Sequence, residues 1–106
     1  MPTIKESFEM MPLRFQPDKA AGTHAVVQYN ISGAGGGVWH AVIKDGTCAM
    51  NAGPAPKPTL LLETTARDWM TVVTGAQSGQ ALFMAGRLKL KGDMGLAMNL
   101  GSMFAK

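Results

Sequence analysis

The sequence has little charge and almost no cysteine. Charged residues make up 16% of its 106 positions, against about 25% in a typical soluble protein. The net charge of +3 is too small and too dispersed to indicate a nucleic-acid surface, which needs a basic stripe with stacking aromatics. Cys48 is the single cysteine, so no internal disulfide can form. The composition therefore indicates neither a nucleic-acid-binding protein nor a disulfide-stabilised one.

Targeting and membrane-spanning patterns are missing as well. No stretch approaches the ~18 consecutive apolar residues of a membrane span. The first six residues lack a basic region followed by an apolar one, and the terminal Ala105-Lys106 differs from the Ser-Lys-Leu peroxisomal address. Together with the lone cysteine, this favours a reducing compartment. We expect the chain to be cytoplasmic.

Apolar residues are plentiful for a chain of this size. They make up 46% of the sequence, nine methionines among them, and there are 13 glycines besides. A chain of 106 residues fits one domain, because two separate cores would each be too small to be stable. We therefore expect a single domain over residues 1–106, with surplus apolar surface inside it or at an interface.

The first half of the chain predicts one helix and four strands. Capping-box spacing of Thr3 and Glu6 starts a helix that carries Ile4, Phe8 and Met11 on one face and ends at Pro12. Period-two alternation then predicts strands over residues 23–31, 38–44, 47–51 and 59–64. A glycine-rich loop (33–37), an Asp45-Gly46 hairpin turn and a proline-broken loop (53–58) connect them. We expect an antiparallel meander.

The second half predicts helices around one more strand. The spacing of Thr65 and Asp68 starts a helix that ends at Gly75, and residues 78–85 form a second, shorter one. Residues 87–91 alternate clearly, with both leucines directed to the core. Asp93 then caps a final helix that reaches Phe104. This order indicates the α+β class, with helices covering one face of a sheet.

The final helix is apolar around nearly its whole circumference. One face can pack on the sheet, and the other must meet a cavity, a membrane or a partner protein. It can also simply be tucked into the core. Gly95 and the three methionines favour a flexible lid, because glycine loosens a helix and methionine adapts to irregular surfaces. Its apolar residues are Met94, Leu96, Ala97, Met98, Leu100, Met103 and Phe104.

Catalytic and metal-binding groups are sparse. His24 and His40 have no second ligand at metal-binding spacing, and Cys48 has no base near it in sequence. The aspartates at 45, 68 and 93 are explained by a turn and two helix caps, which leaves no carboxylate pair for acid–base chemistry. We expect no enzyme activity, no metal and no cofactor. The glycine run at 33–37 departs from the phosphate-binding pattern at Val38.

Three segments together resemble the sterol carrier protein 2 family. They are Gly-Gly-Val-Trp-His at 36–40, Lys-Asp-Gly at 44–46, and Leu-Phe-Met-Ala-Gly-Arg-Leu-Lys-Leu-Lys-Gly-Asp-Met at 82–94. The last segment is the most specific, and the resemblance covers nearly the whole chain. It implies a five-stranded, mainly antiparallel sheet with helices on one side that enclose an apolar tunnel. Domains of this family also occur inside larger enzymes, where they present ligands or dimerise.

The resemblance implies a non-catalytic domain that binds and transfers a fatty acid, acyl chain, sterol-like or isoprenoid lipid. The matching tunnel positions are Trp39, Ile43, Trp69, Val73, Phe83, Met84, Leu88, Leu90, Met94, Met98 and Phe104. Arg87, Lys89 and Lys91 share the solvent face of their predicted strand, where they protect a sheet edge or contact anionic lipid transiently. The alternative function is an interaction or dimerisation module that uses the apolar C-terminal helix, so the chain is either a monomer or a homodimer.

Overall fold

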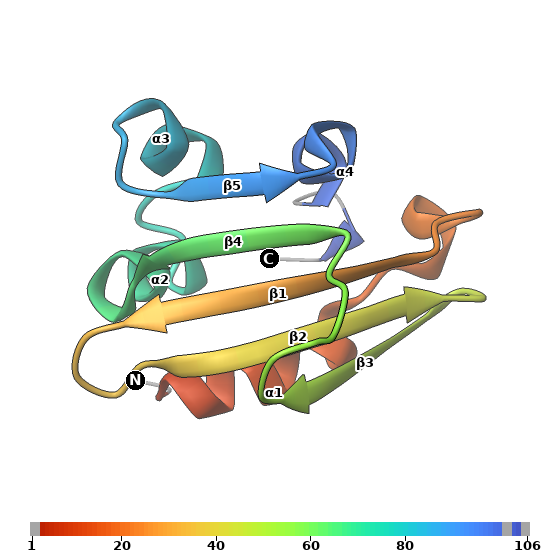
Figure 1. Cartoon of the computed structure of the whole chain (residues 1–106), viewed down its shortest axis with the longest axis horizontal. Helices are drawn as coiled ribbons and strands as arrows, with labels where there is room; N and C mark the ends of the chain where they lie inside the picture. Colours follow the sequence, from red (N-terminus) through yellow and green to blue (C-terminus); the bar gives the residue numbers. More distant parts are fainter. Residues whose placement is uncertain (1–2, 101–102, 105–106) are drawn as a thin grey trace.

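A five-stranded sheet forms the centre of the fold. The computed structural model describes residues 3–100, 103 and 104. The strands are β1 (Ala25–Ser32), β2 (Gly37–Lys44), β3 (Thr47–Ala52), β4 (Leu60–Thr65) and β5 (Lys89–Gly92). They lie side by side in the order β3-β2-β1-β4-β5 (Figure 1). The α+β class predicted from the sequence is confirmed, and the sheet is mostly antiparallel with one parallel pair.

The central strand β1 buries every second residue. Ala25, Val27, Tyr29 and Ile31 are buried, and the residues between them are half-buried, as period-two alternation predicts for a sheet covered on one face. Tyr29 lies opposite Trp39 of β2. The β2–β3 hairpin turns at Asp45 and Gly46, whose φ angles of 51° and 73° are those of the tight turn that Asp-Gly favours.

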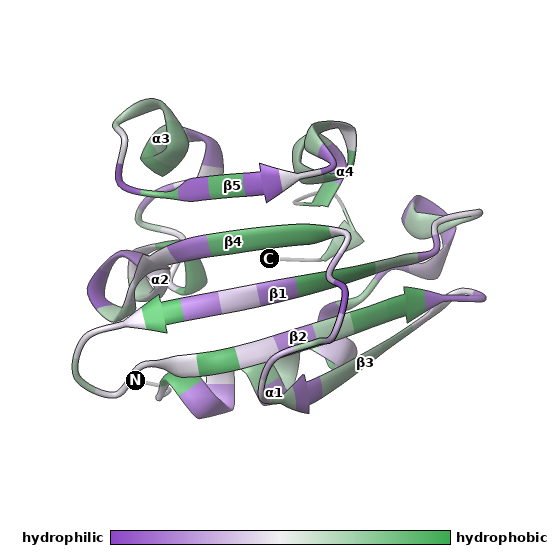
Figure 2. Cartoon of the chain, viewed as in Figure 1, coloured by the Kyte–Doolittle hydropathy of each residue, from purple (hydrophilic) through white to green (hydrophobic). Residues whose placement is uncertain are grey.

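The position of β4 corrects the predicted meander. β4 pairs in parallel with β1, with Val27 opposite Leu60, instead of pairing with β3. β5 then adds antiparallel to the other side of β4. The run Leu60-Leu61-Leu62 is the signal of an interior strand, which has neighbours on both sides and reads as a continuous apolar segment. Figure 2 shows this hydrophobic stretch in β4.

The connection from β3 to β4 crosses the face of the sheet opposite α1 (Figure 1). Three hydrogen bonds hold it there: Gly53 N–H donates to Val38 O (2.8 Å), Ala55 N–H to Gln28 Oε1 (3.0 Å), and Thr59 N–H to Val26 O (2.7 Å). The prolines in this segment cannot form the regular turn that an antiparallel neighbour of β3 would need. The chain therefore passes over β2 and β1 to the far side of the sheet.

The helices are α1 (Ile4–Arg14), α2 (Ala66–Val73), α3 (Gly79–Met84) and α4 (Met94–Leu100), with a 3₁₀ turn, η1 (Pro17–Ala20). The capping box of Thr3 and Glu6 forms as predicted. The predicted end of this helix at Pro12 is wrong, because α1 continues to Arg14 with Pro12 inside it. The missing Pro12 N–H costs one helical bond, and the helix ends two residues after Pro12.

The end of α4 also corrects a prediction. Asp93 Oδ1 accepts a hydrogen bond from Leu96 N–H at 2.9 Å, which confirms Asp93 as the cap. The helix ends at Leu100 instead of reaching Phe104, and the predicted helical residues 101 and 102 lie outside the described residues. Phe104 forms an isolated antiparallel bridge with Phe15. The chain therefore returns to the C-terminal end of α1.

Candidate functional site

An aromatic cluster fills the layer between the sheet and helices α1 and α2. Phe8 of α1 is fully buried, and its ring stacks on Trp69 of α2 with centroids 4.9 Å apart and on Trp39 of β2 at 5.4 Å. Tyr29 of β1 lies 5.1 Å from Phe8 and edge-on to Trp69 at 5.4 Å. Such contacts stabilise beyond the area they bury, so this cluster joins the helix layer to the sheet.

A buried hydrogen bond links α1 to α2 beside these rings. Ser7 is buried, and its Oγ accepts a hydrogen bond from Trp69 Nε1 at 2.9 Å. The same hydroxyl donates to Ile4 O at 2.6 Å. Both polar groups are satisfied within the protein, as buried polar groups usually are. The seam between the two helices is therefore held by ring stacking and one polar contact.

The residues predicted to line a tunnel separate into an interior group and an exposed group. Ile43, Trp69 and Leu88 are buried in the main core. The other four residues of the interior group are partly buried and pack against that core. They are Trp39, Val73, Leu90 and Phe104. The interior between the helices and the sheet is filled by side chains such as Phe8 and Tyr29, and the structure does not show the tunnel that the resemblance implies.

The exposed group lies on α3 and α4. Phe83 is 41% exposed, Met84 78%, Met94 43% and Met98 85%. In Figure 1, α3 lies near the start of β5 and α4 near its end, and hydrophobic residues dominate α3 (Figure 2). Each helix keeps one anchor in the core, Leu82 in α3 and Leu96 in α4. Four of the eleven predicted tunnel residues are therefore exposed to solvent instead of lining an interior cavity.

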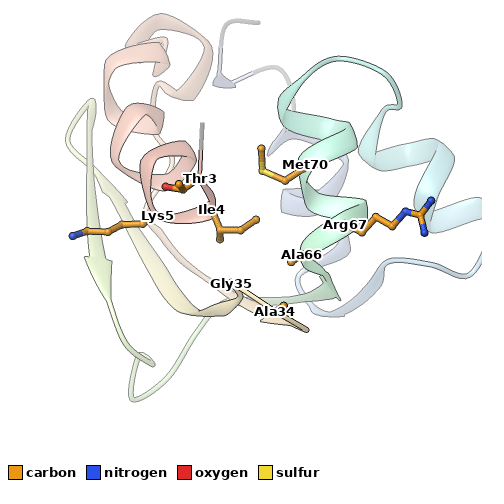
Figure 3. Close-up of a pocket in the computed structure, with 8 residues that line it drawn as sticks. All are labelled: Thr3, Ile4, Lys5, Ala34, Gly35, Ala66, Arg67 and Met70. Atoms are coloured by element: carbon orange, nitrogen blue, oxygen red, sulfur yellow. The ribbon is translucent and has the colours of Figure 1, made fainter. Parts of the chain in front are cut away.

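Two open depressions lie elsewhere on the surface. The first is between the N-terminal ends of α1 and α2, above the loop at Ala34 and Gly35 (Figure 3). Ile4 and Met70 face each other in it, whereas Lys5 and Arg67 point outward. The second lies around the ends of β1 and β4 and includes Arg87 and Lys89. None of the eleven predicted tunnel residues lines either depression.

The three predicted surface cations differ in their surroundings. Arg87 precedes β5, which begins at Lys89, so the prediction that all three share one strand face is wrong. The Arg87 guanidinium is 2.6 Å from Asp68 Oδ1, and the Asp68 side chain is only 6% exposed. Asp68 is therefore the partner of Arg87, besides giving its N–H to the Thr65 cap. Lys89 and Lys91 are exposed on the edge strand β5.

His40 and Cys48, two of the reactive side chains considered from the sequence, lie in β2 and β3. His40 Nδ1 is 2.8 Å from Gly53 O, so that nitrogen carries the proton and the imidazole helps to hold the β3–β4 connection. Burial raises the pKa of the half-buried Cys48 thiol to about 11. Within residues 3–100 and 103–104, no three His, Cys, Asp or Glu side chains gather in a group that could hold a metal ion. In the same residues, no helix has both the length and the apolar character to cross a membrane.

The sequence pattern of the SCP-2 sterol transfer family matches residues 12–105. The chain belongs to this family. Among curated proteins of the family, it is 31% identical to the hydroxysteroid dehydrogenase-like protein 2 of Danio rerio over 103 residues, which is 96% of this chain and 25% of that protein. The human protein of the same name is 28% identical over 92% of this chain and 23% of its own length. The chain thus spans about a quarter of these relatives.

Solved structures have the same fold over nearly the whole chain. The palmitated SCP2L2 of Aedes aegypti superposes with a TM-score of 0.79 at 20% identity, over 95% of this chain and 93% of that one. A part of the inverting sec-alkylsulfatase Pisa1 of Pseudomonas sp. superposes with a TM-score of 0.81 at 17% identity, over 99% of this chain and 17% of the sulfatase. The SCP-2 fold thus occurs both by itself and as part of a larger enzyme.

Sequence reasoning did not select Phe8, Ser7 or Tyr29 as site residues. Phe8 and Tyr29 were expected to be apolar positions of a helix face and a strand, and both are in the core. A signal was present for Tyr29, which is the single tyrosine and lies on the buried face of the clearest central strand. A buried hydroxyl usually has a hydrogen-bond partner, so a tyrosine at this position calls for a search for its partner.

Proposed function

We propose that this SCP-2 domain binds an apolar lipid between its sheet and its helices and transfers it without catalysing a reaction. Membership of the family over residues 12–105 carries this proposal. The palmitated Aedes structure supports a fatty acid or acyl chain as the class of ligand. The aromatic layer of Phe8, Trp39 and Trp69 supplies the apolar surface against which such a chain can lie.

The closed interior is the expected state of a domain without lipid. An empty cavity of ~300 Å³ would cost about 7 kcal/mol at roughly 24 cal/mol per Å³. A whole domain has a free energy of unfolding of only about 5–15 kcal/mol. The elements therefore pack together when no lipid separates them. In the proposal, the lipid moves the helix layer away from the sheet and takes up the space.

The eleven predicted lipid-binding residues fit two roles in this proposal. The interior group would contact the lipid from the sheet and from α2. The exposed group on α3 and α4 would turn inward or cover the lipid as these short helices move. The interior group is Trp39, Ile43, Trp69, Val73, Leu88, Leu90 and Phe104, and the exposed group is Phe83, Met84, Met94 and Met98.

The C-terminal helix is the proposed gate. Leu96 anchors this helix in the core, and further along the chain the Phe104 ring lies 5.6 Å from Phe15, which follows α1. Gln16 N–H donates a hydrogen bond to Met103 O at 2.7 Å. Opening would break these local contacts and leave the β1–β4 pairing intact. A gate of this kind needs little energy compared with unfolding the domain.

Lys89 and Lys91 are the proposed contacts with an anionic membrane. Each contributes on the order of 1 kcal/mol near such a surface, which suits transient docking during lipid transfer. Arg87 contributes less, because its charge already pairs with Asp68. Exposed Met94 and Met98 lie just after these lysines in the chain and would enter the interface beside them.

Native mass spectrometry of freshly purified protein, followed by solvent extraction, tests the proposal. A discrete adduct that extracts as a fatty acid or acyl conjugate would support it. The same protein, once extracted, should take up palmitate added back to it. A bare mass with no uptake from a panel of fatty acid, acyl ester, sterol and isoprenoid would overturn it.

An interaction module is the second candidate function, and the exposure of Met84 and Met98, 78% and 85%, favours it. In this case α3 and α4 pack against a second copy of the chain instead of covering a lipid. Sizing chromatography of extracted protein distinguishes the two. A dimer that becomes monomeric in Met84→Ser/Met98→Ser would favour the module, and a protein that is monomeric from the start would count against it.

A further inference from the structure

Tyr29 carries a buried hydroxyl without a partner. The residue is 1% exposed, and its OH is the buried side-chain polar atom of residues 3–100 and 103–104 for which no hydrogen-bond partner is present. An orphan polar group in a protein interior costs roughly 1–3 kcal/mol. Native proteins retain such a group where a ligand, an ion or a water completes it.

The other buried polar side chains of this layer all have hydrogen-bond partners. A missing partner is therefore particular to Tyr29 and is not a general property of the layer. Ser7 and Trp69 bond to each other at 2.9 Å. Thr64 donates to Arg87 O at 3.0 Å, and Asp68 accepts from Arg87. The hydroxyl of Tyr29 is thus the one polar function of the described interior that is left for another molecule.

The surroundings of Tyr29 coincide with the space proposed for the lipid. Its ring lies beside Phe8 and Trp69, and its strand neighbours in register are Trp39 of β2 and Leu62 of β4. A lipid that separates the helices from the sheet would therefore lie against the face from which this side chain projects. The hydroxyl would be the polar feature of an otherwise apolar wall, the arrangement by which pockets orient their ligands.

We propose that the Tyr29 hydroxyl donates a hydrogen bond to an uncharged oxygen of the bound lipid, such as an ester carbonyl or an alcohol. This inference rests on the proposed lipid-binding function. A carboxylate is disfavoured at this place, because an ion buried among aromatic rings loses its hydration without gaining a counter-ion. Arg87 is not available as that counter-ion, since it is paired with Asp68.

The protonation state of Tyr29 agrees with a donor role. Burial, with a smaller contribution from Cys48, raises the pKa of the Tyr29 hydroxyl well above its ordinary value. The hydroxyl therefore keeps its proton at every pH at which the domain would carry lipid. The lipid oxygen accepts, and no proton is transferred.

Binding of three C16 probes to solvent-extracted protein tests the anchor. The probes are methyl palmitate, hexadecan-1-ol and hexadecane, and Trp39 and Trp69 fluorescence reports their uptake. The wild type should bind the two oxygen-bearing probes more tightly than hexadecane. Tyr29→Phe keeps the ring and should lose on the order of fivefold in affinity for those two, since a net hydrogen bond contributes about 1 kcal/mol. Its affinity for hexadecane should be unchanged.

The stability of ligand-free Tyr29→Phe provides an independent reading. Removal of an orphan hydroxyl should leave the melting temperature equal to that of the wild type or raise it. A lower melting temperature would mean that a buried water or a side chain already pairs with the hydroxyl, which would overturn the anchor. An equal loss of affinity for all three probes, or no loss, would also overturn it.

Cys48→Ala is the matched control, because the thiol is the polar group that acts electrostatically on Tyr29. This variant should keep the preference for the oxygen-bearing probes, and a loss of preference would assign the anchor to Cys48. Failure of the wild type to bind any of the three probes would instead overturn the proposed function, and the anchor with it. The two failures are therefore distinguishable.

Discussion

Two of the polar side chains in the core differ in how they are compensated. Asp68 is 4% exposed and pairs with Arg87 at 2.6 Å, whereas Tyr29 has no partner within the described chain. The Asp68–Arg87 contact fixes α2 to the segment before β5. The Tyr29 hydroxyl, by contrast, is left available to another molecule. At the scale of single residues, stability and function are thus assigned to different polar groups.

Loss of the Asp68 carboxylate should destabilise the domain. Asp68→Ala leaves the Arg87 guanidinium without its partner, and we expect a loss of about 2 kcal/mol in the free energy of unfolding, measured by urea denaturation. Asp45→Asn is the control, because Asp45 is exposed and lies 3.7 Å from an exposed His24, and Asn tolerates the positive φ of this turn residue. That change should stay within about 0.5 kcal/mol. Equal effects of the two substitutions would contradict the role given to the buried pair.

Cys48 should react slowly with thiol reagents. Burial raises its pKa from 9.0 to about 11, so the folded protein holds about a hundredfold less thiolate near pH 8 than an ordinary cysteine. Because the unfolded chain releases this proton near pH 9, the raised pKa favours folding below that pH, and the contribution is lost as the pH rises through 11. Alkylation by iodoacetamide, followed by mass spectrometry, should show an apparent pKa near 11 in buffer and near 9 in urea. Equal pKa values would refute the burial argument.

The elements divide into a rigid sheet with its aromatic layer and two short peripheral helices. α3 and α4 each bury a single leucine, while β1 and β4 bury three or more residues each. A helix of seven residues has little stability of its own and depends on its cap and its packing. Local opening is therefore expected at α3 and α4 before it occurs in the sheet.

Removal of the α4 cap should open this helix selectively. Asp93→Ala loses the bond to Leu96 N–H, which costs about 1 kcal/mol, so amide exchange in residues 94–100 should accelerate roughly fivefold. Hydrogen exchange with mass spectrometry measures this. Ser78→Ala, which removes the corresponding cap of α3, should accelerate exchange in residues 79–84 instead. If both variants open both helices, the two move as one unit and α4 is not a separate gate.

The sequence predicted the elements better than their arrangement. Alternation in residues 25–31 and the Asp45-Gly46 turn are local signals, and both are confirmed. The parallel pairing of β4 with β1 depends on a connection of irregular residues, whose course period-two reasoning does not determine. Likewise, Arg87 looked like a third surface cation, because its partner Asp68 is 19 positions away in the sequence.

The candidate site was only partly predictable for a similar reason. Apolar residues such as Ile43, Trp69 and Leu88 were expected in the interior and lie there. Phe83 and Met98 belong to the same apolar pattern but are exposed, because short helices at the sheet edge have one covered face only. The spacing of apolar residues in the sequence does not distinguish a residue that packs in the core from one that remains exposed.

The whole molecule combines a closed interior with exposed apolar helices, so its stability should depend on lipid. Saturation with palmitate at ~100 times its dissociation constant should add about 2.7 kcal/mol to the free energy of unfolding. Thermal unfolding of extracted protein with and without palmitate measures this, and hexadecyltrimethylammonium at the same concentration controls for detergent-like binding. An unchanged melting temperature across the lipid panel would count against lipid carriage.

The crossing of the sheet face by the β3–β4 connection has a consequence for the order of folding. The β1–β2 and β2–β3 pairs close over short loops, but Val26 meets Thr59 across 33 residues. Pairings between distant residues form late, since the entropy of closing the loop must be overcome first. We expect the three-stranded N-terminal sheet to form early and β4 to dock afterwards. Substitutions in the β2–β3 hairpin should then slow folding, whereas substitutions in β4 should chiefly speed unfolding.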